Sequence, residues 1–92
     1  MKAREKRDEQ YWRKLMKDLR ARIDKANANV AAQEARLAEI DGGEQTATRE
    51  REREIVNESL SRAQRDARTL TDELTRFITR AQIAKVPDEW IQ

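Results

Sequence analysis

The sequence contains one pair of adjacent glycines, Gly42 and Gly43, and apolar residues recur every three or four positions on both sides of it. This spacing places side chains on one face of an α-helix. The pattern therefore predicts two long helices that fold back on each other at the diglycine. The two apolar runs are Trp12, Met16, Leu19, Ile23, Ala26, Val30, Leu37 and Ile40, and then Val56, Leu60, Ala63, Ala67, Leu70, Leu74, Phe77, Ala81 and Ala84.

The composition is that of a long-helix protein. Charged residues make up 41% of the chain and the mean hydropathy is −1.08, values that alone are typical of a disordered segment. An abundance of Ala, Glu, Lys, Leu and Arg with a period near 3.5 residues is instead typical of a coiled coil. Because the chain has 92 residues, we expect one all-α domain, a coiled-coil hairpin with a narrow seam between two antiparallel helices.

The ends of the two helices follow from local signals. Either glycine can supply the left-handed residue that ends a helix, and Asp41, Thr46 and Thr48 are candidate N-caps of the second helix. Pro87 disfavours helical geometry in the residue before it, so it ends the second helix. We expect a first helix over 2–40, a turn over 41–45, a second helix over 46–85 and a short irregular tail over 86–92, folded back on the open end.

A fold about position 43 predicts which residues face each other. Each layer of the seam then joins heptad position a to position d, as antiparallel helices require. Charges beside the seam agree, since Arg22 would face Asp66 and Arg36 would face Glu52. The expected layers are Trp12 with Leu74, Met16 with Leu70, Leu19 with Ala67, Ile23 with Ala63, Ala26 with Leu60, and Val30 with Val56.

The end of the hairpin opposite the diglycine, here called the open end, gathers more large apolar side chains than a two-helix seam covers. One interpretation is a terminal mini-core, in which Pro87 turns the chain and Trp90 folds back over the helix ends. The other is an exposed patch that binds a second copy or another protein, and the two can coexist. The candidate residues are Tyr11, Trp12, Leu15, Leu74, Phe77, Ile78, Val86, Pro87, Trp90 and Ile91.

The residue types present exclude most catalytic chemistry. The chain has no His and no Cys, which removes the commonest general base, the commonest metal ligand and every thiolate. Its only two glycines are adjacent, so it has no glycine-rich phosphate loop. We therefore expect neither an enzyme nor a cofactor or metal site.

Charge suggests a second class of partner. Residues 1–25 carry ten Lys or Arg against five Asp or Glu, so an alternative function is a basic adaptor that binds nucleic acid or an anionic membrane through residues 2–25. Acids interleave with the later arginines, and no aromatic residue lies among them to stack on bases, which argues against nucleic acid. No apolar run approaches the roughly 18 residues that span a bilayer, so only contact with a membrane surface stays open.

The favoured function is a non-enzymatic structural or protein-interaction module. Its expected partner is another protein or a second copy, and a dimer through the aromatic open end is the simplest form. A four-helix bundle along the full length is less compatible with the polar residues that flank the seam. These residues are Arg20, Asn27, Asn57 and Gln64.

The two least generic segments are Tyr11-Trp12-Arg13 and Val86-Pro87-Asp88-Glu89-Trp90-Ile91. With the hairpin between them, they resemble a group of bacterial helical-hairpin proteins of unknown function, which have a Tyr-Trp-Arg element and a Val-Pro-x-x-Trp C-terminus. The group usually has Pro-Gly where this chain has Asp88-Glu89. The resemblance implies that Trp90 docks near Tyr11 and Trp12.

The resemblance also bears on location. It implies a periplasmic or secreted protein if an export signal has been removed, and otherwise we expect a cytoplasmic one. The first ten residues are charged, but no apolar segment follows them. The sequence as given therefore shows no secretory signal.

Overall fold

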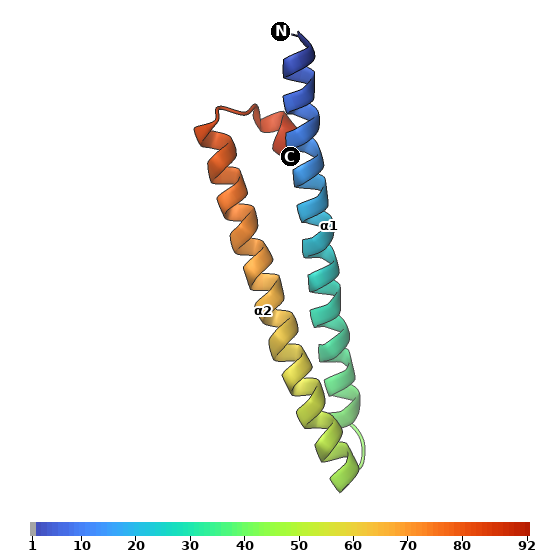
Figure 1. The fold of residues 1–92 in the computed structure, drawn as a ribbon. Helices are drawn as coiled ribbons and strands as arrows, with labels where there is room; N and C mark the ends of the chain where they lie inside the picture. Colours follow the sequence, from blue (N-terminus) through green and yellow to red (C-terminus); the bar gives the residue numbers. More distant parts are fainter. Residues whose placement is uncertain (1) are drawn as a thin grey trace.

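The computed structural model describes the backbone of residues 2–92 and the side chains of residues 7–92. Helix α1 covers Lys2–Asp41, helix α2 covers Ala47–Ile83, and a single 3-10 turn, η1, covers Asp88–Ile91. The two long helices are antiparallel and form a rod of 67 × 17 × 14 Å (Figure 1). The expected all-α hairpin is confirmed, while the tail, expected to be irregular, contains the turn of η1.

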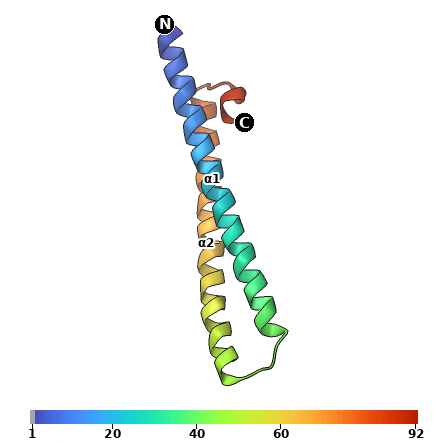
Figure 2. The same cartoon turned by 90° about the vertical axis from the view of Figure 1, so that its right-hand side faces the viewer.

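The two helices twist around each other. In Figure 1 the helices are apart at the open end and overlap near the turn. In Figure 2, turned by 90°, they overlap at the open end and are apart near the turn. A heptad repeat produces this twist, because helices must supercoil to keep a seam of period 3.5 in contact. The first turns of α1 project beyond the end of α2 in both views.

The fully buried apolar residues among 7–92 all belong to the two predicted runs. Two of them are alanines, and small residues in the seam let the helices approach closely. The remaining positions of the two runs are half-buried, apart from the exposed Ala84 at the end of α2, as expected where two helices share one contact face. The buried residues are Met16, Leu19, Ile40, Val56, Ala63, Phe77 and Ala81.

The second helix begins with a side-chain cap. The backbone N–H of Arg49 donates to Thr46 Oγ1 at 3.2 Å, which satisfies one of the free donors of the first turn. Of the three predicted candidates, Thr46 is therefore the N-cap. Asp41 is instead the last residue of α1, and Thr48 lies inside α2.

The turn uses its glycines differently from the prediction, because neither has a positive φ angle. The N–H of Gly42 still donates to the carbonyl of Ala38 at 3.0 Å, in the helical pattern. A Cβ on Gly43 would collide with the guanidinium of Arg49, so this glycine leaves room for a side chain. The expectation of a left-handed glycine is wrong, and the left-handed residue is Lys85 at the end of α2.

The contacts across the seam differ from the predicted alignment. Arg22 pairs with Glu73 at 3.5 Å, seven residues beyond the expected Asp66. Arg53 pairs with Asp41 at 2.8 Å, although the fold about position 43 would have set Arg53 against Gln33. Both differences have the same direction and about the size of one heptad. A shift of this size keeps every a and d residue in the seam, so the apolar pattern cannot distinguish the two alignments.

Candidate protein-interaction site

The open end is built around three buried side chains, Met16 and Leu19 from α1 and Phe77 from α2. Met16 and Leu19 point to the same side of α1 because they are about one helical turn apart. Partly buried apolar residues from both helices and from the tail surround them. These are Trp12, Leu15, Ile23, Leu70, Leu74 and Ile91.

The aromatic side chains of this cluster lie in a row. The rings of Trp12 and Phe77 have centroids 5.2 Å apart and are tilted by 51°, and Tyr11 meets Trp12 edge-on at 5.8 Å. These offset and edge-on arrangements are the favourable ones for aromatic pairs. The guanidinium of Arg80 lies over Phe77, 6.0 Å from the ring centroid. The row therefore ends in a buried Phe at α2 and an exposed Tyr on α1.

The tail reaches this cluster through a sharp end to α2. The N–H of Val86 donates to the carbonyl of Ala81 at 2.9 Å, and the N–H of Lys85 donates to the carbonyl of Gln82 at 3.1 Å. This pair of bonds is the Schellman motif, which requires a left-handed residue, and Lys85 has φ 57°. Pro87 follows, where the helix has already ended.

The residues of η1 then lie against α1. Ile91 packs on the buried cluster, and the side chain of Arg20 donates to the carbonyl of Ile91 at 3.4 Å. Trp90 shares a shallow hollow with Arg13, Met16 and Arg20. In Figure 2 the tail stands to one side of the two helices, so it covers one flank of the open end.

The ten candidate residues thus fall into three groups. Phe77 is buried, and Tyr11 and Pro87 are exposed, Tyr11 to 60%. The other seven are half-buried: Trp12, Leu15, Leu74, Ile78, Val86, Trp90 and Ile91. Ile83, outside that set, is 77% exposed. Part of the apolar open end therefore forms a small core, and part of it faces solvent.

A groove runs along the contact line of the helices from the open end toward the middle of the rod. Two hollows, of about 540 and 570 Å³, lie along it, and the Arg22–Glu73 ion pair lines both of them. Apolar residues from both helices form the floor, and charged residues form the rims. The floor includes Leu15, Leu19, Ala26, Ala63, Leu70 and Phe77. Sequence reasoning assigned most of these to the seam and did not foresee a groove beside it.

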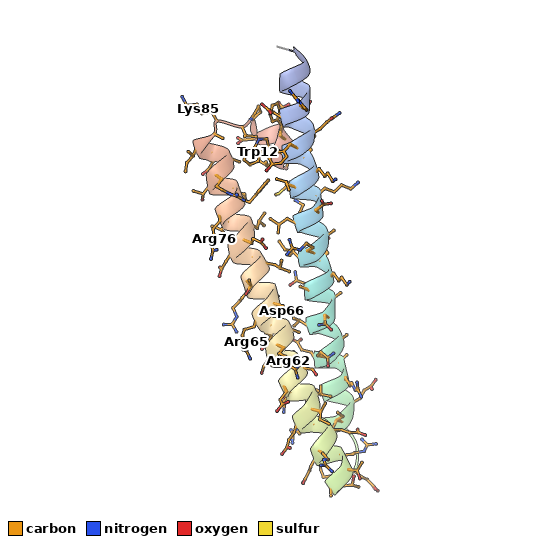
Figure 3. All side chains as sticks on the ribbon, viewed as in Figure 1. Trp12, Arg62, Arg65, Asp66, Arg76 and Lys85 are labelled. Atoms are coloured by element: carbon orange, nitrogen blue, oxygen red, sulfur yellow. The ribbon has the colours of Figure 1, made fainter. Side chains whose placement is uncertain are left out.

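The charged side chains are solvated. The ion pairs Arg13–Glu9, Arg22–Glu73, Arg53–Asp41 and Arg62–Glu58 all join side chains that are at least 37% exposed. In Figure 3 the arginines Arg65 and Arg76 point away from α1. Within residues 7–92, acidic side chains do not gather in a group of three that could hold a metal ion. None of the described helices has a stretch long and apolar enough to cross a membrane.

No family model matches the chain, and neither a curated protein nor a solved structure proves similar to it. The class of protein defined by its own geometry is a two-helix, all-α hairpin with an apolar open end.

Proposed function

We propose that this chain is a non-enzymatic protein-interaction module that binds through its open end. The observation that carries the proposal is the exposure of large apolar side chains there. Tyr11 is 60% exposed, and Trp12, which it meets edge-on, is half-buried. Ile55, near the turn, is 60% exposed but is not part of such a group. Grouped exposed apolar residues mark interaction surfaces, whereas single ones are common on any protein.

The shape of the molecule supports this function. A rod of 67 Å with a thin core has no interior in which a dry catalytic site can be enclosed. It can instead present a surface at a fixed distance from its turn. The mixture of aromatic and aliphatic side chains at the open end is the composition that protein interfaces favour at their centres.

Site-specific photocrosslinking in living host cells tests the proposal. A photoreactive amino acid replaces Tyr11 at the open end, and the matched control replaces the exposed Glu44 in the turn. We expect adducts of higher mass from position 11 and few from position 44. Equal yields at the two positions, or none at position 11, would exclude the open end as the binding surface.

A second candidate function is the basic adaptor. It is supported by Arg13, Lys17 and Arg20, which line one hollow together with Trp90, although Asp24 lies there too. Purified protein would be titrated with vesicles of anionic lipid and, separately, with a nucleic-acid duplex. Binding through basic residues should weaken steeply with salt. Binding that persists at about 0.5 M salt would rule out this mode.

A further inference from the structure

The tail and the groove lie on opposite sides of α1. Arg13, Lys17 and Arg20 face the tail, whereas the groove is lined by Leu15, Arg22 and other residues. With 3.6 residues per turn, these two sets point in nearly opposite directions from the helix axis. Tyr11 is four residues before Leu15, so it continues the groove side to the open end. One flank of the hairpin is therefore covered by its own chain, and the other is not.

Charged residues of both signs line the groove on the two helices. Arg22 on α1 lies level with Glu73 on α2, as their ion pair shows. Each hollow also contains a further pair of opposite charges, one from each helix. Lys25 of α1 shares the first hollow with Asp66 of α2, and Asp18 of α1 shares the second with Arg80 of α2.

We propose that a second copy of this chain fills the groove, with the two hairpins packed face to face about a two-fold axis parallel to the rod. In this arrangement α1 of each copy lies beside α2 of the other at the same level. Arg22 of each copy therefore meets Glu73 of the other, and the apolar floors meet between them. This inference rests on the proposed function and deepens it, because the partner becomes a second copy and the contact extends from Tyr11 along the groove.

Arg22 and Glu73 can each form a second ion pair, with the second copy. The in-chain distance from Arg22 to Glu73 is 3.5 Å, and both side chains are about half exposed, at 59% and 48%. A carboxylate accepts several hydrogen bonds and a guanidinium donates five. Each group can therefore keep its partner in the hairpin and bind the matching group of the second copy. A two-fold axis makes such an interface self-complementary.

The exposed area agrees with a dimer. The chain exposes 7498 Å² at a mass of 10.8 kDa, whereas a compact monomer of that mass exposes about 5,500 Å². The excess, about 2,000 Å², exceeds the roughly 800 Å² that each partner contributes to a typical stable interface. The polar residues Arg20 and Asn27, which argue against a bundle, are seven positions apart and lie on the tail side of α1.

Charge exchange tests this arrangement in the full-length protein. Arg22→Glu makes both rims acidic at that level, and Glu73→Arg makes both basic. Sedimentation equilibrium should show each variant alone with a dimer dissociation constant raised at least about tenfold. An equimolar mixture should restore dimers that contain one copy of each variant, because the acidic rims of one copy then meet the basic rims of the other. Mass spectrometry under native conditions identifies these mixed dimers.

Two results would overturn the inference. One is a wild-type chain that stays at the mass of a monomer from micromolar to submillimolar concentration. The other is a wild-type dimer whose charge variants, folded by circular dichroism, gain nothing from mixing, since the dimer would then use another surface. If a charge variant fails to fold, Ala26→Glu at the groove floor replaces it, with the exposed Ala28→Glu as the matched control. Only the former should dissociate the dimer, and equal effects would also overturn the inference.

The same experiments separate this inference from the proposed function. A wild-type monomer whose position 11 crosslinks to a different protein would remove the dimer and leave the open end as a binding site. A wild-type dimer that obeys the charge exchange supports both. A monomer without adducts at position 11 would remove both.

Discussion

Lys85 has a conformation that should cost stability. Its φ angle of 57° lies in the left-handed region, where an L-residue with a side chain pays about 1–2 kcal/mol. The two bonds of the Schellman motif, from Lys85 to Gln82 and from Val86 to Ala81, hold it there. Figure 3 shows the Lys85 side chain directed away from the rest of the molecule, so packing of that side chain does not offset the cost. Glycine is the residue that this position normally favours.

The substitution Lys85→Gly should therefore stabilise the hairpin. It removes a cost of about 1–2 kcal/mol, but the greater freedom of glycine in the unfolded chain offsets roughly 0.5–1 kcal/mol. The net gain is about 0.5–1 kcal/mol. For a chain of 92 residues, an unfolding entropy of about 2.1 cal/mol/K per residue converts this gain into a rise in Tm of about 3–5 °C.

Thermal unfolding followed by circular dichroism measures the effect, with Lys85→Ala as the control. The alanine variant loses the same amine and stem but keeps a Cβ in the left-handed conformation. All samples need the same protein concentration, because association also raises the apparent stability. A glycine variant with a Tm no higher than that of the alanine variant would refute the backbone explanation.

Two further substitutions examine the turn and the tail. Thr46→Ala removes the cap of α2 and should lower the free energy of unfolding by about 1 kcal/mol, whereas Thr48→Ala inside α2 should have little effect; equal losses at both positions would contradict this. Trp90→Ala should lower the free energy of unfolding by about 1–2 kcal/mol, because half of a large side chain leaves its contact with α1. Ile83→Ala, at a site that is 77% exposed, is its control, and equal melting temperatures for the two would show that the tail does not dock.

The fold could be predicted from periodicity because a helix needs only a repeating apolar face. Within residues 7–92, every fully buried residue lies in the two runs read from the sequence, and Thr46 was one of the predicted caps. The alignment of the helices could not be predicted in the same way. Sliding α2 by seven residues returns an a or d residue to each seam position. The apolar pattern therefore does not determine whether Arg22 contacts Glu73 or Asp66, and the structure shows Glu73.

The path of the tail was also beyond the sequence. Pro87 indicated where the helix ends, but the direction of the chain after it depends on the left-handed Lys85, and lysine gives no signal for that conformation. The glycines misled in the opposite way, since neither has a positive φ angle and the guanidinium of Arg49 occupies the space beside Gly43. A residue type indicates which φ angles its backbone can adopt, and the surrounding contacts determine which of these angles it has.

The docking of the tail gives the hairpin two unequal flanks, which the symmetric heptad pattern did not suggest. The turn of η1 places Ile91 against Met16, Leu19 and Phe77 from one side, and among the described residues this cover has no counterpart on the groove side. Two hairpins that meet through their groove sides would bury the apolar floor and keep both tails outward. Such an assembly closes after two copies, because the tail blocks the second flank from repeating the contact. A hairpin without the tail would have two open flanks, and only polar residues of the tail side, such as Arg20 and Asn27, would then disfavour association beyond pairs.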